Sequence, residues 1–136
     1  INNISMNICI SEFTYTAFKE RLNKDLAGHS IVLIDEKGML KESVQPDALF
    51  LSYEVMFKAL ADEEYKLNLM NALESCTFVQ GSWAGTESEF AQEIISKVKT
   101  FSHGGGIHAI TIATYVFSQN IERCQRYRFS YRKTKE

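Results

Sequence analysis

The loop Gly81-Ser-Trp-Ala-Gly85 has the residue types of a small anion-binding site, and the chemistry expected of it is recognition of a carboxylate. It follows an apolar run and precedes Thr86, where we expect a helix to begin. Glycines allow backbone conformations that turn amide N–H groups outward, and a helix N-terminus favours negative charge. The amides of Ala84 and Gly85 would then hold a small carboxylate. The alternative is a tight strand-to-helix turn in which Trp83 packs as a lid.

Two other segments end expected strands, where open parallel sheets bind their ligands. They are Ser52-Tyr-Glu54 and His103-Gly-Gly-Gly106. His103 and His108 flank the glycines, and either could face a ligand, but neither has an Asp or Glu at the spacing of a proton relay. The acidic pair Asp35-Glu36 follows the second expected strand; it could supply catalytic carboxylates in another fold, but we interpret it as a solvated turn.

The composition is that of an ordinary globular domain. The chain has 136 residues, of which 45% are hydrophobic and 24% charged, so we expect one folded domain with a sizeable core. No apolar run approaches the roughly 18 residues that a membrane span needs, and residues 1–5 lack the features of a signal peptide. Cys9, Cys76 and Cys124 are far apart with no Cys-x-x-Cys spacing. Free thiols in a reducing cytoplasm are therefore expected, and no metal site.

Charge is unevenly distributed along the chain. Residues 122–136 carry six basic and two acidic side chains, a net charge of +4, so the rest of the chain carries −6. A basic segment can bind nucleic acid or an acidic partner. The alternative is a solvated helix end, where cations are favoured by the helix dipole. We favour the helix end and expect no nucleic acid, because the body is acidic and no aromatic-basic stripe is present.

Short apolar runs alternate with longer amphipathic segments, which is typical of an α/β fold with a parallel sheet. Strands are expected at residues 6–10, 30–34, 48–52, 76–80 and 100–103, and helices at residues 12–27 and from Asp62, Thr86 and about His108 onward. The predicted fold class is α/β: a flavodoxin-like three-layer sandwich with a five-stranded parallel sheet of order 2-1-3-4-5 and a long C-terminal helix. Residues 1–120 would form this domain, and residues 121–136 a basic helix end or tail.

Periodicity and capping signals define the expected helices. Phe18, Leu22 and Leu26 fall on one face of the 12–27 helix. Thr86 and Glu89 have the spacing of a capping box for the helix that follows them. The last helix is apolar on two faces and should therefore have neighbours on two sides. One face contains Ile110, Ala113, Phe117, Ile121 and Cys124, and the other contains Ile112 and Val116.

Two motifs resemble the substrate-binding (catalytic) domain of the D-isomer-specific 2-hydroxyacid dehydrogenases. The first is Gln80-Gly-Ser-Trp-Ala-Gly-Thr-Glu87, where family members commonly read Gln-Ser-x-x-Ala-Gly-Val-Asp between a strand and a helix. The second is Ile112-Ala-Thr-Tyr-Val116 after a glycine turn, similar to Ile-Ala-Glu-Tyr-Val in the family. Thr114 stands where the family has Glu, which puts the usual contact between this helix and the second domain in doubt. The similarity covers residues from about 6 to 120.

The resemblance implies roles for particular residues. Ser82, Trp83, Ala84 and Gly85 would form the loop that holds the carboxylate of a small 2-keto or 2-hydroxy acid. Tyr53, after the third strand, matches a position that often contacts the substrate side chain. The segment formed by His103, Gly104, Gly105 and Gly106 would be the hinge that faces the cofactor.

The family's nucleotide-binding half has no counterpart in these residues. No Gly-x-Gly-x-x-Gly follows a strand, since the three glycines at 104–106 lack the third fingerprint position. The family's catalytic Arg, Glu and His also belong to that half. We therefore expect the substrate-binding half of an NAD(P)-dependent D-2-hydroxyacid dehydrogenase. It would bind neither NAD nor NADP alone, would turn over no substrate alone, and would form a homodimer through the last helix. The alternative is a free-standing, non-catalytic ligand- or partner-binding module that kept the fold.

Overall fold

The computed structural model describes residues 4–106 and 109–133, with side chains as far as Ile121. The chain divides into two compact units, Ile1–Gly104 and Gly105–Glu136. The expected domain boundary after residue 120 stays a prediction, and a single helix runs through that point in the second unit.

Five short strands form the parallel sheet of the first unit. They are β1 (Asn7–Ser11), β2 (Ser30–Ile34), β3 (Ala48–Leu51), β4 (Phe78–Gly81) and β5 (Thr100–Ser102). All four pairings are parallel and the order is β2-β1-β3-β4-β5, which confirms the predicted topology. Their β-branched and apolar sequences are those of strands covered on both faces.

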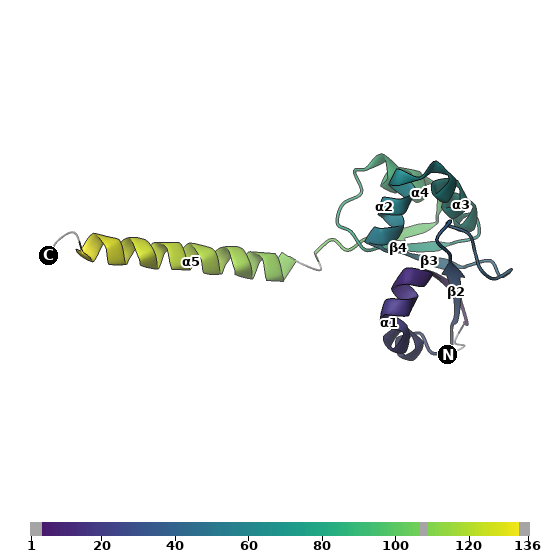
Figure 1. The fold of residues 1–136 in the computed structure, drawn as a ribbon, viewed down its shortest axis with the longest axis horizontal. Helices are drawn as coiled ribbons and strands as arrows, with labels where there is room; N and C mark the ends of the chain where they lie inside the picture. The colour runs from purple at the N-terminus through teal and green to yellow at the C-terminus, as the bar shows by residue number, and fades with distance from the viewer. Residues whose placement is uncertain (1–3, 107–108, 134–136) are drawn as a thin grey trace. The chain divides into compact units, whose positions relative to one another are not determined.

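Helices lie on both sides of this sheet, as a flavodoxin-like sandwich requires. The helices of the first unit are α1 (Glu12–Asp25), α2 (Tyr53–Ala61), α3 (Glu63–Leu73) and α4 (Glu89–Lys97). Figure 1 shows α2, α3 and α4 together on one side, with α1 on the other. The model therefore confirms the predicted fold class.

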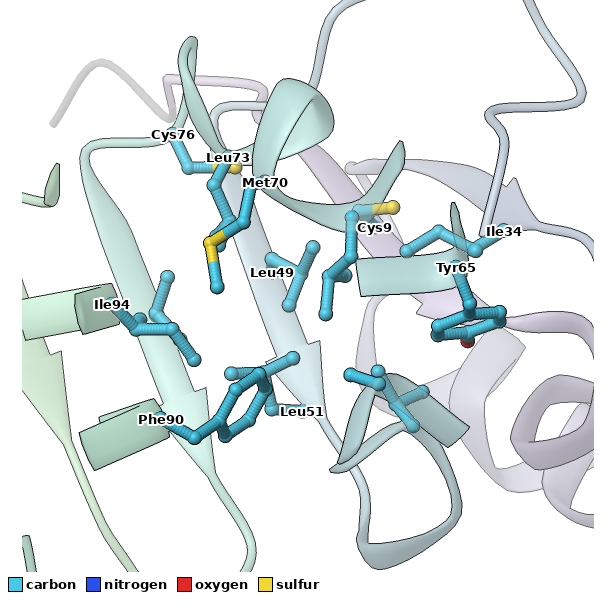
Figure 2. Packing of buried hydrophobic residues seen from close by; sticks show 14 of the residues in the cluster. Cys9, Ile34, Leu49, Leu51, Tyr65, Met70, Leu73, Cys76, Phe90 and Ile94 are labelled. Carbon is cyan, nitrogen blue, oxygen red and sulfur yellow. The ribbon is translucent and has the colours of Figure 1, made fainter. Parts of the chain in front are cut away.

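The core lies between the sheet and α2, α3 and α4. The strand register aligns Val32, Cys9, Leu49, Val79 and Phe101 in one row across the sheet. Side chains in such a row share a face, because alternate residues of a strand point to opposite sides. Helical residues cover the row, and Figure 2 shows several of them around Leu49 and Leu51: Tyr65, Met70, Leu73, Phe90 and Ile94.

Two helix starts differ from the sequence expectation. Helix α2 was not expected; it begins after Ser52, whose hydroxyl accepts from the Val55 N–H at 3.4 Å. The capping box at Thr86 and Glu89 was wrong: α4 starts at Glu89, and Ser88 accepts from the Ala91 N–H at 3.2 Å. The expected N-cap at Asp62 is confirmed, because its carboxylate accepts from two first-turn amides of α3.

Helix α1 is kinked, which breaks the apolar face expected for it. Phe18 has φ −125° and ψ 22°, outside the helical region, and its side chain is 61% exposed. Leu22 and Leu26 are partly buried. The expectation of one continuous face from Phe18 to Leu26 was therefore wrong, because the turn at Phe18 rotates the second half of the helix relative to the first.

The second unit contains α5 (Ala109–Lys133), which begins close to the expected position. Its 25 residues correspond to a length of about 37 Å. Taken by itself, α5 exposes large apolar side chains on both expected faces: Ile110, Phe117 and Ile121 on one, Ile112 and Val116 on the other. Tyr115, on neither of these faces, is exposed as well. The side chain of Cys124, expected on the first face, lies outside the described part. Among the described residues, no helix combines the length and hydropathy needed to cross a membrane.

Cys9 and Cys76 are free, buried thiols. Burial raises the pKa of Cys9, with a smaller contribution from Cys76, and burial raises the pKa of Cys76 from 9.0 to about 12. Neutral buried thiols are poor nucleophiles. Both side chains therefore belong to the core rather than to a site.

We expect the domain to lose stability at alkaline pH. Above pH 9 the two thiols ionise in the unfolded chain while the folded chain keeps them protonated, so the unfolded state binds fewer protons and becomes favoured. The loss between pH 9 and 10 should be about 2 kcal/mol for the pair. Urea unfolding followed by circular dichroism at several pH values measures this slope, and Cys76→Ala should reduce it by about half. An unchanged slope in that variant would contradict the assignment.

Candidate functional site

The loop between β4 and α4 is tied to both neighbouring strand ends. The Ser82 N–H donates to the Leu51 carbonyl at the end of β3, at 2.9 Å. The Gly104 N–H, just after β5, donates to the Trp83 carbonyl at 2.7 Å. The backbone of the loop is therefore held at the carboxyl edge of the sheet, where ligands of open α/β folds bind.

Trp83 is a core residue. Its side chain is 7% exposed, and its ring lies 6.2 Å from both the Phe90 and the Phe101 ring centroids. Gly81 leaves room for it, since a Cβ there would lie 3.4 Å from the indole and 3.2 Å from Phe101. Of the two roles open from sequence, a ligand-holding loop residue and a packed turn, the side chain takes the second. Only its backbone is available to a ligand.

Gly85 gives the loop its shape. Its φ of +91° is a conformation that residues with a Cβ rarely adopt, and a Cβ there would collide with the Glu87 carboxylate. Glu87 Oε2 accepts from the Thr86 N–H at 2.9 Å. The side-chain amide of Gln92 in α4 donates to the Thr86 carbonyl at 2.6 Å. The loop thus places a carboxylate of the protein itself against the turn that the sequence predicts to bind one.

Ser82 and Tyr53 complete the predicted substrate-binding set. Within the described residues, the Ser82 hydroxyl is buried without a hydrogen-bond partner. Tyr53 begins α2 at the end of β3, the strand next to β4, so it lies at the same edge of the sheet as the loop. Its ring is 48% exposed and stacks on Phe57 with centroids 6.3 Å apart. Ala84, between Trp83 and Gly85 in the loop, is exposed.

The predicted hinge coincides with the division between the two compact units. His103 and Gly104 end the first unit, and Gly105 and Gly106 begin the second. Gly104 packs so closely that a Cβ would lie 2.8 Å from the Ser82 carbonyl oxygen. Gly106 has φ +88°. A hinge role for this segment stays a prediction.

A second polar cluster lies at the other end of the same edge, and it joins Glu54, which the sequence placed at a strand end, to Ser11 and Thr14, which the sequence did not single out. Ser11 ends β1 and its hydroxyl lies 2.9 Å from Glu54 Oε2 and 3.0 Å from the Thr14 hydroxyl. Glu54 Oε1 pairs with Lys58 Nζ at 2.8 Å. The available signals were the Ser-x-x-Thr spacing after the first strand and the Glu-x-x-x-Lys spacing after the third.

No metal site is found in the part of the chain that the structure describes. No group of three or more His, Cys, Asp or Glu side chains there is arranged to hold a metal ion. Comparison of the chain with family models, with curated proteins and with solved structures gives no match.

Proposed function

We propose that this domain is the substrate-binding half of an NAD(P)-dependent dehydrogenase that interconverts 2-keto acids and D-2-hydroxy acids. The observation that carries the proposal is the β4–α4 loop, where Gly85 at φ +91° and the Thr86 N–H already accommodate a carboxylate, that of Glu87. The motifs of this loop and of α5, which resemble that dehydrogenase family, support the same conclusion.

In this proposal the substrate carboxylate takes the place of the Glu87 carboxylate. The amides of Ala84, Gly85 and Thr86 lie in the turn before α4, which begins at Glu89, and they are the donors that would hold the anion. Tyr53, on the next strand end, contacts the substrate side chain. Because few groups contact so small a ligand, we expect a dissociation constant in the millimolar range, which corresponds to a binding free energy of about −4 kcal/mol.

Nicotinamide binding is not assigned to these residues. The segment Gly104-Gly-Gly-Ile-His-Ala109 has Ala at the third fingerprint position, where the fingerprint takes Gly or Ala, but among the described residues no strand follows α5 to complete the βαβ unit that binds a dinucleotide. When bound to a second domain, NAD or NADP would accept or donate the hydride. The residues described here would bind and orient the acid.

Glu87→Gln should strengthen binding of a 2-keto acid about threefold, because the variant removes the internal negative charge that competes for the loop amides. Calorimetric titration with pyruvate measures the change. Glu74→Gln, an equally conservative change at an exposed position on α3's C-terminal side, should leave the affinity unaltered. Equal affinities of Glu87→Gln and the unmodified chain would count against direct competition at the loop.

The large apolar side chains that α5, taken by itself, leaves uncovered favour a second function, binding of a protein partner, and the simplest partner is a second copy of the chain. The double variant Ile112→Lys/Val116→Lys should therefore shift the chain toward monomer in sedimentation velocity. Gln119→Lys/Asn120→Lys adds the same charge to polar positions of α5 and should not. A monomeric unmodified chain at tens of micromolar would rule the homodimer out.

A further inference from the structure

One face of α5 carries a hollow, formed where small side chains lie between large ones. It has a volume of about 490 Å³ and is lined by Ala113, Thr114, Phe117, Ser118 and Ile121. With α5 taken by itself, the side chains of Phe117 and Ile121 are 71% and 49% exposed. Helices pack by placing side chains of one helix into such hollows on the other, so this face has the form of a helix-packing surface.

The hollow suits an apolar occupant. The Ser118 hydroxyl donates to the Tyr115 carbonyl at 2.8 Å, so it is already satisfied within the helix. Residues 105–121 contain no Asp, Glu, Lys or Arg, so no charged side chain of this segment could hold an ionic ligand. A small molecule resting on one helix would keep much of its surface in water, whereas small-molecule sites bury most of their ligand. A second helix, by contrast, would cover the whole face.

A single neighbouring helix cannot cover both apolar faces of α5. At 3.6 residues per turn, the hollow faces a direction about 150° from that of Ile112 and Val116. The proposed homodimer covers the face of Ile112 and Val116, which leaves the hollow face without a neighbour. A helix that is apolar on two faces expects neighbours on two sides.

A second copy of α5 that runs antiparallel fits the hollow by size. If the two helices cross at Phe117, which is midway between Ala113 and Ile121 in the chain, Ala113 of each helix lies opposite the partner's Ile121. The smallest side chain of the hollow then faces a large one. In a parallel pair Ala113 would face Ala113 and Ile121 would face Ile121, which leaves a gap at one position and crowds the other.

Charge also favours the antiparallel arrangement. Residues 122–136 carry a net charge of +4, and residues 1–104 carry nine basic and fifteen acidic side chains, a net charge of −6. A parallel pair would place the two basic segments side by side, where they repel each other. In an antiparallel pair each basic segment runs toward the start of the partner's α5, which a short segment joins to the partner's acidic first unit. Opposite charges then attract across the pair.

We propose that the hollow face of α5 binds α5 of a further copy of the chain in an antiparallel pair, so that two homodimers join into a tetramer. Each chain then has two different two-fold contacts, one at the hollow and one at Ile112 and Val116. Two such contacts with perpendicular axes close at four copies. This inference rests on the proposed homodimer and does not involve the β4–α4 loop.

Sedimentation velocity tests the number of copies. The unmodified chain at tens of micromolar should sediment as a species of about four times the 15.5 kDa of one chain. Phe117→Lys/Ile121→Lys, on the hollow, should leave a dimer. Ile112→Lys/Val116→Lys, on the other face, should also leave a dimer, and the four changes together should give a monomer.

Thr111→Lys/Tyr115→Lys adds the same charge to neither apolar face and should leave the tetramer unchanged. A dimeric unmodified chain would overturn the tetramer but leave the homodimer standing, whereas a monomeric chain would overturn both. Species that keep growing with concentration would indicate head-to-tail contacts and would also overturn the proposal. So would a Phe117→Lys/Ile121→Lys variant, folded by circular dichroism, that remains tetrameric.

Disulfide formation tests the orientation of the pair. In a Cys124→Ser background the remaining Cys9 and Cys76 are buried. There Ala113→Cys/Ile121→Cys should form a disulfide between chains on mild oxidation, seen by non-reducing gel electrophoresis, because the antiparallel pair brings the two positions together. Ala113→Cys alone should stay reduced. A disulfide between chains in the Ala113→Cys single variant would show a parallel pair and overturn the proposed arrangement.

Discussion

Trp83→Ala is expected to lower the free energy of unfolding by about 3–5 kcal/mol, the usual cost of truncating a large buried aromatic side chain. The indole is 7% exposed and fills the space between the rings of Phe90 and Phe101. Its removal would leave a cavity beneath the β4–α4 loop and release the loop from the core. Carboxylate binding should therefore weaken together with stability. Trp83 is the only tryptophan, so the variant has no tryptophan fluorescence to follow. Urea unfolding monitored by circular dichroism therefore measures the change in stability.

Trp83→Phe is the matched control for that experiment. It keeps an aromatic ring between the same neighbours and should cost well under half as much as the alanine change. If Trp83→Ala were as stable as the unmodified chain, the indole would not be a core residue, and the interpretation of Trp83 as a ligand-holding loop residue would return.

Gly104→Ala is expected to disrupt the loop directly. The added methyl would lie 2.8 Å from the Ser82 carbonyl oxygen and 3.4 Å from the Trp83 carbonyl oxygen. These are backbone atoms and cannot turn aside, so the chain must move and the 2.7 Å bond from Gly104 N–H to Trp83 O must lengthen. We expect a loss of about 1–3 kcal/mol in stability, typical of overpacking, and a loss of more than tenfold in pyruvate affinity.

Gly28→Ala provides the comparison for Gly104→Ala. Gly28 has φ +94° with nothing within 4 Å of the position of an added Cβ, so its replacement carries only backbone strain. It should cost about 1 kcal/mol and leave pyruvate affinity unchanged. Similar affinities for the Gly104 and Gly28 variants would show that the hydrogen bond from the Gly104 N–H to the Trp83 carbonyl does not matter for binding.

The sheet was predictable because its strands are short, apolar and β-branched, and the segments between them have helical periodicity. Helix α2 was missed for the same reason that β3 was found. The apolar residues of β3 continue into Val55 and Met56 without a glycine or proline, and only Ser52 marks the boundary. The kink at Phe18 has no sequence signal, since neither glycine nor proline occurs between residues 11 and 27.

The candidate sites were predictable only in part. The glycines and strand-to-helix position of the β4–α4 loop can be read locally, so the loop was found. The burial of Trp83 depends on Phe101, which is 18 positions away in the chain, and the return of the Glu87 carboxylate to the Thr86 amide depends on the conformation at Gly85. The cluster of Ser11 and Glu54 requires the ends of β1 and β3 to meet, which only the folded sheet brings about.

The most direct test of the proposal that the β4–α4 loop binds a carboxylate is an amide-shift titration of the ¹⁵N-labelled chain with pyruvate and with D-lactate. The largest shifts should fall on Ala84, Gly85 and Thr86, with Tyr53 affected less, and both acids should saturate the same residues in the millimolar range. The neutral analogue pyruvamide should leave the chemical shifts of these amides unchanged. If the amide shifts of Ala84, Gly85 and Thr86 do not change up to about 50 mM pyruvate, or if pyruvamide changes them equally, the loop does not recognise a carboxylate and the central claim is wrong.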